Sequence, residues 1–379
     1  MKKNLFLIVC LLLVGVYLKG QYNTTLDLIK ITKTKEFKNT SDIFELVKFV
    51  PLETNNETLT KVSTTVVTKD NIFMFSNAQG CILKFDREGK FIGKIGRQGR
   101  GPGEFVSQFN LTLFRYYNNY IYLFDGMSFK IMKYSIDGQS YQDIPLEEKT
   151  GFIFSDMLDE NCFLIAKSSP FINKNQSGAY SELMSYNAKG NLTYNFPLNS
   201  NSKIQNNLML PSIFYHFNNI VYYKSPYCDT VFKILGPTER TIAYTLSPGN
   251  KRMVSNETKG AIVVYGLHET HRYILIDYSY DKTRRAVYDK VTGSFFQVNS
   301  RKEEDNIGGC AFLWPDPLRI DESKVPGEYI TYIEPAVLKG LDINKLNIQS
   351  GYIKSELLKL QNKVNENDNP IIVIMREYE

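Results

Sequence analysis

Histidine, tryptophan and cysteine are all scarce in this sequence of 379 residues, which contains 3 His, 1 Trp and 5 Cys. The cysteines are widely spread and form no Cys-x-x-Cys pair, so the ligand spacing of a structural zinc site is absent. No Gly-x-Ser-x-Gly sequence occurs, and no cysteine has a histidine close by in the sequence. These absences argue against zinc-ribbon proteins and against the familiar serine and cysteine hydrolases.

The sequence also has almost no net charge once the first 20 residues are set aside. Residues 1–20 contain three lysines and no acid, so their removal lowers the net charge from +5 to +2. Such a small charge gives no reason to expect a nucleic acid partner. The apolar content of 43%, with 25 Tyr and 24 Phe, is enough for a sizeable core and suits β-sheets.

The N-terminus has the pattern of a secretory signal peptide. Lys2 and Lys3 precede an apolar run over residues 5–16. A membrane span needs roughly 20 such residues, so this run is short for one. We expect a signal peptide over residues 1–20, no membrane span after its cleavage, and a location in the periplasm or at the cell surface. Lipid attachment at Cys10 and an uncleaved anchor are the less favoured alternatives.

Four cysteines remain beyond that segment, namely Cys81, Cys162, Cys228 and Cys310. An oxidising compartment would permit one or two disulfides among them. A thiol is also a small hydrophobic group that packs well in a core. We therefore favour buried free cysteines over disulfides.

A strand–hairpin pattern recurs along the chain. The apolar and aromatic strands that open each unit are residues 72–75, 121–124, 162–165, 220–223, 273–276 and 329–332. They recur at intervals of about 40–60 residues, as propeller blades do. Tight turns such as Asp137-Gly138 and Lys189-Gly190 follow in the first five units, because glycine supplies the positive φ that a hairpin needs. The sequence thus predicts five complete units and a shortened sixth.

The sixth unit needs a strand from elsewhere. It starts at residue 329, passes through a helical insert near 355–363 and ends in the apolar run 371–375. The stretch 44–52 near the N-terminus can pair with that last strand and remove the open edge. We therefore predict an all-β fold, a six-bladed β-propeller over residues 30–379, whose last blade is closed by N- and C-terminal strands.

The glycine-rich stretch GRQGRGPGEF, residues 96–105, is either a phosphate-binding loop or a turn. A P-loop ends in Gly-Lys-Ser/Thr before a helix, and a dinucleotide fingerprint lies between a strand and a helix. Here Gly103, Glu104 and Phe105 lead instead to the next strand-rich unit. We favour a turn between blades, with Phe105 filling the seam. Ligand binding by Arg97 and Arg100 is the alternative.

GRQGRGPGEF resembles the inter-blade signature of NHL-type propellers. FVPLET at residues 49–54 and NDNPIIVI at residues 367–374 look like two further signatures. Together the three resemble the 6-bladed β-propeller family of Bacteroidetes cell-envelope proteins. The resemblance implies an exported six-bladed propeller and transfers no catalytic residue. The GPGEF signature does not recur in units four to six, where the resemblance is weakest.

Two further groups of residues are candidates for chemistry. His268-Glu269-Thr270-His271 lacks the His-Glu-x-x-His spacing and precedes a strand, so a surface loop is favoured over a metal site on His268 and His271. That metal site is kept as an alternative because some NHL-like propellers are metal-dependent lyases. Arg272 and Arg284 are candidates for binding an acidic ligand, and solvated surface residues are the competing interpretation.

These observations lead to two functional hypotheses. The first is an exported, non-enzymatic propeller that binds a protein partner or a glycan at the cell envelope, at the mouth of the central channel. The alternative is a metal-dependent lyase or hydrolase of NHL-like type. We predict no cofactor, leave a metal ion in the channel as an open question, and expect a monomer.

Overall fold

The structure is a computed structural model. It describes residues 24–61, 64–106, 113–147, 153–167, 181–197, 211–226, 228–253, 258–298, 325–345, 348 and 350–378. The predicted signal peptide (1–20), Cys10 and Cys310 lie outside these residues.

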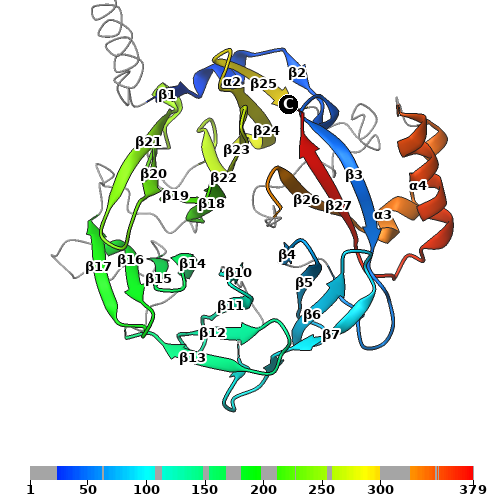
Figure 1. Cartoon of the computed structure of the whole chain (residues 1–379). Helices are drawn as coiled ribbons and strands as arrows, with labels where there is room; N and C mark the ends of the chain where they lie inside the picture. The colour runs from blue at the N-terminus through cyan, green and yellow to red at the C-terminus, as the bar shows by residue number, and fades with distance from the viewer. Residues whose placement is uncertain are drawn as a thin grey trace, which may run out of the picture.

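Six mainly antiparallel sheets surround a common centre as the blades of a propeller (Figure 1), which confirms the predicted fold class. Blade one comprises β4 (Thr65–Val67), β5 (Asn71–Ser76), β6 (Cys81–Asp86) and β7 (Phe91–Ile95). Blade two comprises β10 (Phe114–Tyr117), β11 (Tyr120–Asp125), β12 (Lys130–Ser135) and β13 (Tyr141–Pro145). Blade three comprises β14 (Ile153–Asp159), β15 (Cys162–Lys167), β16 (Ser181–Asn187) and β17 (Leu192–Pro197).

The other three blades also take strands from the N-terminal region. Blade four comprises β18 (Ile213–Phe217), β19 (Ile220–Lys224), β20 (Thr230–Ile234), β21 (Arg240–Ser247) and the added strand β1 (Thr24–Asp27). Blade five comprises β22 (Val263–Glu269), β23 (Tyr273–Tyr280), β24 (Lys282–Asp289), β25 (Ser294–Val298) and the added strand β2 (Phe37–Lys38). The described part of blade six comprises β26 (Glu328–Ile333), β27 (Ile371–Glu377) and β3 (Phe44–Pro51).

Each of blades one to five follows chain order from the innermost strand outward (Figure 1). The turns from first to second strand and from third to fourth strand therefore lie at one end of the propeller, which we call the turn end. The loops between blades and the turns from second to third strand lie at the opposite end, which we call the loop end. Side chains near the ends of the innermost strands consequently meet at the turn end.

The strands that the sequence pattern placed first are second in their blades. Residues 72–75, 121–124, 162–165, 220–223 and 273–276 fall within β5, β11, β15, β19 and β23. An innermost strand precedes each of them and was missed, because these inner strands mix polar with apolar residues. Asn118 and Asn119 form the β10–β11 turn with φ of 48° and 64°. Asn218 and Asn219 repeat this turn after β18.

Blade six is closed by one strand from the N-terminal region, β3, and by the C-terminal strand β27, as predicted. β27 pairs antiparallel with β3, from Ile371 opposite Pro51 to Glu377 opposite Phe44. Arg87, in the β6–β7 turn, pairs with Glu328 at the start of β26, at 3.1 Å. β26 therefore begins at the turn end, and β26, β27 and β3 run in the directions of second, third and outermost strands.

The helical insert of blade six is also confirmed. α3 (Pro335–Lys339), η5 (Ile343–Lys345) and α4 (Gly351–Lys363) lie between β26 and β27. The Ser350 hydroxyl caps α4 by accepting from the Ile353 N–H at 3.3 Å. Leu357 and Leu360 of α4 pack into the core cluster between blades five and six. None of the helices in the described part of the chain has the length and apolar character to span a membrane.

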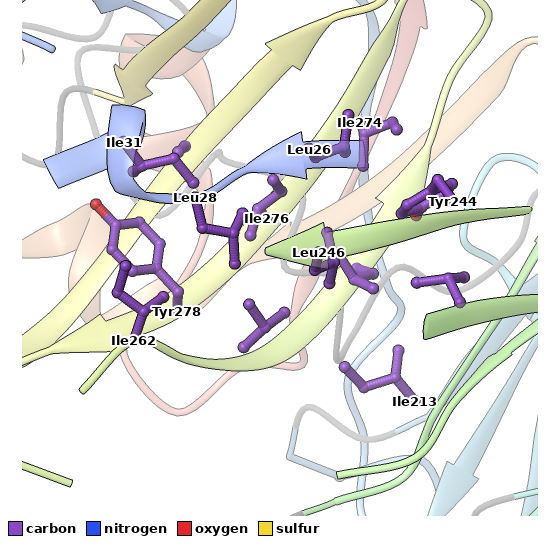
Figure 2. Packing of buried hydrophobic residues seen from close by; sticks show 14 of the residues in the cluster. Leu26, Leu28, Ile31, Ile213, Tyr244, Leu246, Ile262, Ile274, Ile276 and Tyr278 are labelled. Atoms are coloured by element: carbon purple, nitrogen blue, oxygen red, sulfur yellow. The ribbon is translucent and has the colours of Figure 1, made fainter. Parts of the chain in front are cut away.

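Residues 24–43, which we call the N-terminal belt, run across the outer edges of blades four and five before entering β3 (Figure 1). The belt contains β1, α2 (Ile29–Lys33), β2 and η1 (Thr40–Asp42). β1 pairs in parallel with β21, and β2 pairs in parallel with β25. Leu26, Leu28 and Ile31 are buried against Leu246, Ile276 and other residues of these blades (Figure 2). Residues 24–29, before the predicted domain start at 30, thus belong to this packing.

The stretch GRQGRGPGEF lies at the loop end between blades one and two, where β8 (Arg97–Gln98) pairs with β9 (Glu104–Phe105). Phe105 is fully buried and its ring centroid lies 5.3 Å from that of Phe75, which confirms its predicted place in the seam. The Gly101 N–H donates to the Glu104 carboxylate at 2.8 Å, and Arg97 also pairs with that carboxylate. The loop therefore binds its own carboxylate where a phosphate loop would bind a ligand.

Candidate functional site

The most buried ionic cluster at the turn end joins three successive blades. Arg115 of β10 donates to Asp156 of β14 through Nε at 2.9 Å and Nη2 at 2.8 Å. His216 of β18 places Nε2 at 3.0 Å from both carboxylate oxygens. All three residues come from innermost strands, so one carboxylate ties blades two, three and four together.

Asp156 is fully buried and remains ionised. Burial alone would raise the pKa of its carboxyl, but the charges and hydrogen bonds of Arg115 and His216 hold the pKa well below its usual range. The carboxylate also accepts the N–H of Met157 at 2.8 Å. Asp156 therefore fixes the orientation of the guanidinium and of the imidazole.

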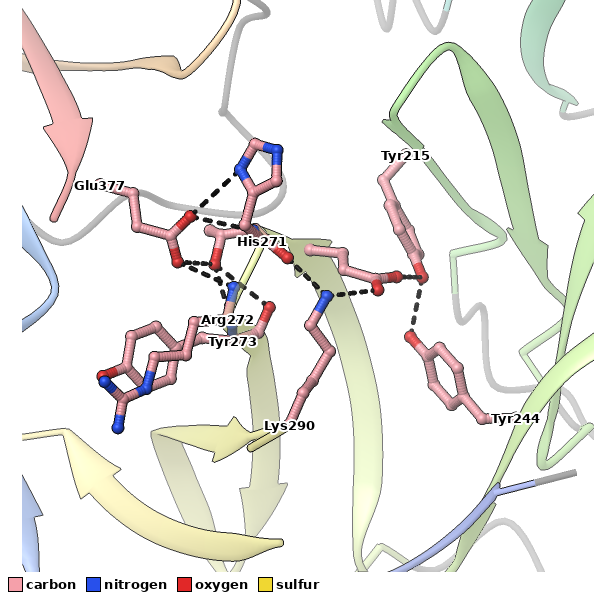
Figure 3. Close-up of polar contacts among 9 residues, drawn as sticks. Tyr215, Tyr244, His271, Arg272, Tyr273, Lys290 and Glu377 are labelled. Carbon is pink, nitrogen blue, oxygen red and sulfur yellow. Dashed lines mark hydrogen bonds and ion pairs between the residues drawn. The ribbon is translucent and has the colours of Figure 1, made fainter. Parts of the chain in front are cut away.

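A second polar cluster joins blades four and five (Figure 3). The Glu269 carboxylate, at the end of β22, accepts from Lys290 Nζ at 2.8 Å and from the Tyr215 hydroxyl at 3.2 Å. Tyr215 also exchanges a 2.8 Å hydrogen bond with Tyr244 of β21. Burial, first of all, raises the pKa of both tyrosines well above the usual value, so they stay protonated.

The turn between β22 and β23 is held by blade six (Figure 3). The Glu377 carboxylate accepts the backbone N–H groups of His271 at 2.9 Å and of Arg272 at 3.1 Å, and also the Thr270 hydroxyl. His271 Nδ1 lies 3.5 Å from Glu377 Oε2. The Arg272 guanidinium donates to Asp289 at 2.8 Å and 3.1 Å. The predicted surface loop is thus a clamped turn between blades five and six.

In the two clusters and in the clamped turn, the base is always more exposed than its acid. The exposed fractions of the basic side chains are 15% for Arg115, 16% for His216, 25% for Lys290, 68% for His271 and 49% for Arg272. Those of the acids are 0% for Asp156, 10% for Glu269, 7% for Glu377 and 2% for Asp289. We call these five bases the cationic arc. The basic groups of the arc are therefore more accessible than the carboxylates with which they pair.

Aromatic rings lie among the bases of the cationic arc. Lys290 Nζ is 4.5 Å from the centroid of the Phe217 ring, and the His271 ring meets the same ring edge-on at 5.6 Å. Phe217 directly follows His216 on β18 and is half-buried. The cation–ring contact adds to the attraction that holds Lys290 in place. Blades four and five therefore share a surface of rings and cations.

The structure separates the two predicted metal ligands. His268 is buried on β22, with its ring 5.6 Å from that of Tyr329 and 6.3 Å from that of Tyr215. His271 is exposed beside Glu377 and belongs to the cationic arc. Within the described residues, no group of three or more His, Cys, Asp or Glu side chains is arranged to hold a metal ion.

The four predicted ligand-binding arginines are also separated. Arg272 lies at the turn end in the cationic arc. Arg97 and Arg100 lie on the glycine-rich loop at the loop end, where Arg97 pairs with Glu104. Arg284 faces Tyr278 across β23 and β24, and its buried Nε has no hydrogen-bond partner among the described residues. The structure therefore does not bring the four together in one site.

Arg115, Asp156, His216 and Lys290 were given no role in the sequence analysis. Arg115 and Asp156 lie 41 residues apart, and Asp156 and His216 lie 60 apart, so no local motif connects them. The available signal was the Asn-Asn turn after β10 and after β18. It marks the end of an innermost strand, where a charged residue reaches the centre of the ring.

Comparisons with known proteins agree with this architecture. The structure is similar to the crystal structure of a putative exported protein from Bacteroides fragilis, with a TM-score of 0.67, 19% sequence identity, and coverage of 94% of this chain and 100% of that chain. It is also similar to a member of the DUF4221 family from Bacteroides vulgatus, with a TM-score of 0.51, 7% identity, and coverage of 89% of this chain and 98% of that chain. At these identities both likenesses show the fold alone.

A looser likeness concerns an enzyme. Virginiamycin B lyase from Staphylococcus aureus gives a TM-score of 0.41 and 10% identity, over 76% of this chain and 81% of that chain, which is too low to carry an argument about activity. No curated protein matches the chain significantly. The family model described as a domain of unknown function, DUF4934, matches residues 23–376. The protein therefore belongs to the DUF4934 family.

Proposed function

We propose that this protein is an exported, non-enzymatic propeller that binds a protein partner or a glycan at the cell envelope through the cationic arc. The observation that carries the proposal is that, at the turn end, each basic side chain of the arc is more exposed than the carboxylate with which it pairs. Each base of the arc rests on a less exposed carboxylate, which fixes its position and leaves its outer side for contact. A preorganised surface of this kind binds without further ordering of its side chains.

Export is part of the same proposal. The basic and apolar pattern of residues 1–20 supports it. The likeness to an exported protein of Bacteroides fragilis is in keeping with it. A periplasmic or surface location then places the arc where envelope proteins and glycans are available.

The proposal is tested by capture from solubilised cell envelopes. The immobilised protein should retain a component that elutes with an unchanged mass, as measured by mass spectrometry. The single variant His271→Gln and the pair Arg272→Gln/Asp289→Asn should weaken retention, because they alter the arc. The matched control, Arg97→Gln/Glu104→Gln, removes an equivalent pair at the loop end and should retain the component fully.

Two outcomes contradict the proposal. Retention that is the same in the arc variants and in wild type would place the contact elsewhere. Chemical conversion of the retained component would show an enzyme rather than a binding module.

A further inference from the structure

We propose that the cationic arc binds an acidic glycan, meaning a chain of sugars that carry carboxylate or sulfate groups. This inference deepens the function proposed above and rests on it, because the arc must first be the contact surface. It names the chemistry of the ligand, which neither the fold nor the family supplies.

The exposed bases of the cationic arc favour an anionic ligand. An anion approaching the turn end meets the guanidinium of Arg272 and the imidazole of His271, while Asp289 and Glu377 lie behind them. The bases are thus held in place by acids that an approaching anion does not reach. Attraction between a fixed cation and an anion is strong where the site is partly shielded from water, and it falls as salt increases.

The aromatic side chains among the bases of the cationic arc favour a sugar. The half-buried Phe217 ring lies against two bases of the arc, with Lys290 Nζ 4.5 Å and the His271 ring centroid 5.6 Å from its own centroid. A sugar offers an apolar face together with polar edges, and aromatic rings pack against such apolar surface. A ring with bases beside it therefore fits an acidic sugar better than a polymer of acidic residues such as poly-glutamate, which offers carboxylates without such an apolar face.

The bases of the cationic arc are distributed over several blades. Arg115 belongs to blade two, His216 to blade four, and Lys290, His271 and Arg272 to blade five. A ligand that touches all of them must extend across several blades. A chain with repeated acidic groups engages such a row by many weak contacts, each of which raises the effective concentration for the next.

Exposed acids limit where the glycan is expected to lie. Glu160 and Glu88 are more exposed than their partners, Lys133 and Lys48. Glu160 belongs to the β14–β15 turn of blade three and would repel an anion there. We therefore expect the main contact on blades four and five, around Phe217.

The test measures binding of the purified protein to four polymers. These are polygalacturonate, chondroitin sulfate, neutral dextran and poly-glutamate, measured by calorimetry or biolayer interferometry at low and high salt. We expect binding to at least one of the two acidic glycans, none to dextran, and weaker binding at high salt. Removal of the Arg272 and His271 donors together with the Asp289 carboxylate, in His271→Gln/Arg272→Gln/Asp289→Asn, should raise the Kd about tenfold, which corresponds to about 1.4 kcal/mol.

Two controls keep the result interpretable. Arg97→Gln/Glu104→Gln, at the loop end, should bind as wild type does. Circular dichroism and the urea midpoint establish that each variant is folded. His271→Gln alone serves if the triple variant fails to fold, because this side chain is 68% exposed.

The outcomes separate the two proposals. Binding to dextran as strong as to the acidic glycans, or binding to poly-glutamate alone, overturns the glycan inference. A protease-sensitive component captured from envelopes through the arc also overturns it while leaving the proposed function standing. Binding that the arc variants do not change overturns both.

Discussion

The imidazole of His216 and the carboxylate of Asp156 lie on innermost strands of neighbouring blades, with Nε2 at 3.0 Å from both carboxylate oxygens. A contact this close, at a fully buried acid, ties blades three and four together at the turn end. It also makes stability depend on pH.

Acid should destabilise the protein in part through Asp156. Its folded-state pKa lies below the unfolded value, which is about 3.9, so its contribution is present above that pH and is lost as pH falls towards the folded pKa. At neutral pH, Asp156→Asn should cost about 3–5 kcal/mol because Arg115 loses its buried partner. Urea unfolding at pH 7 and pH 3 should show a difference from wild type that shrinks at the lower pH. Glu88→Gln, at an exposed pair, is the control and should change little.

The N-terminal belt should be a substantial source of stability. Ile31 is fully buried in the cluster between blades four and five, so Ile31→Ala should cost about 2–5 kcal/mol of unfolding free energy. Phe37, on the same belt, is 61% exposed and Phe37→Ala should cost little. Equal urea midpoints for the two variants would show that the belt packs loosely.

Gly89 should be required at the seam between blades one and six. It has a φ of +86°, and a Cβ there would collide with the carbonyl oxygen of Pro51 on β3. Gly89→Ala should therefore destabilise by more than about 1 kcal/mol. Gly93→Ala is the matched variant, since a Cβ at Gly93 meets nothing within 4 Å. A thermal shift that affects both variants equally would contradict this account.

The buried thiols should be unreactive in the folded protein. Burial raises the pKa of Cys162 to about 12 and also raises that of Cys81, so neither forms a thiolate near neutral pH. Both are free cysteines, as is the partly buried Cys228. Alkylation at pH 8 followed by peptide mapping should label Cys228 first and the other two only after unfolding. Rapid labelling of Cys162 in the folded state would be inconsistent with its burial.

The protein purified without added metal or chelator should contain no stoichiometric transition metal or calcium. The reason is that His268 packs between aromatic rings while His271 lies in the exposed turn held by Glu377. Elemental analysis checks this directly. A metal present at one ion per chain, and lost in His268→Gln or His271→Gln, would restore the lyase or hydrolase hypothesis.

The outer parts of the blades were predictable because their signals are local. Apolar strands and turn glycines such as Gly138 and Gly190, both with positive φ, follow one another within a few residues. Closure by β3 and β27 was also predictable, since an unpaired apolar strand at each end implies a partner. The innermost strands were not, because residues such as Asp156 interrupt the apolar pattern that marks a strand.

The candidate site was less predictable than the fold. His271 and Arg272 were singled out as candidate residues, but their partner Glu377 lies 106 residues away from His271. Spacing cannot reveal such a contact, because only the curvature of the ring brings blade six beside blade five. The parallel pairing of β1 with β21 was missed for the same reason.

The N-terminal belt has a consequence for how the protein is made. Thr24 pairs opposite Tyr244, and Pro51 opposite Ile371, so the sheet partners of these two early strands are synthesised much later. Closing such long loops is slow compared with forming a hairpin. A chain that stops short of Ile371 leaves β3 without its partner strand, and the ring stays open. Ring closure thus follows the synthesis of β27, and β3 has no sheet partner before that strand is made.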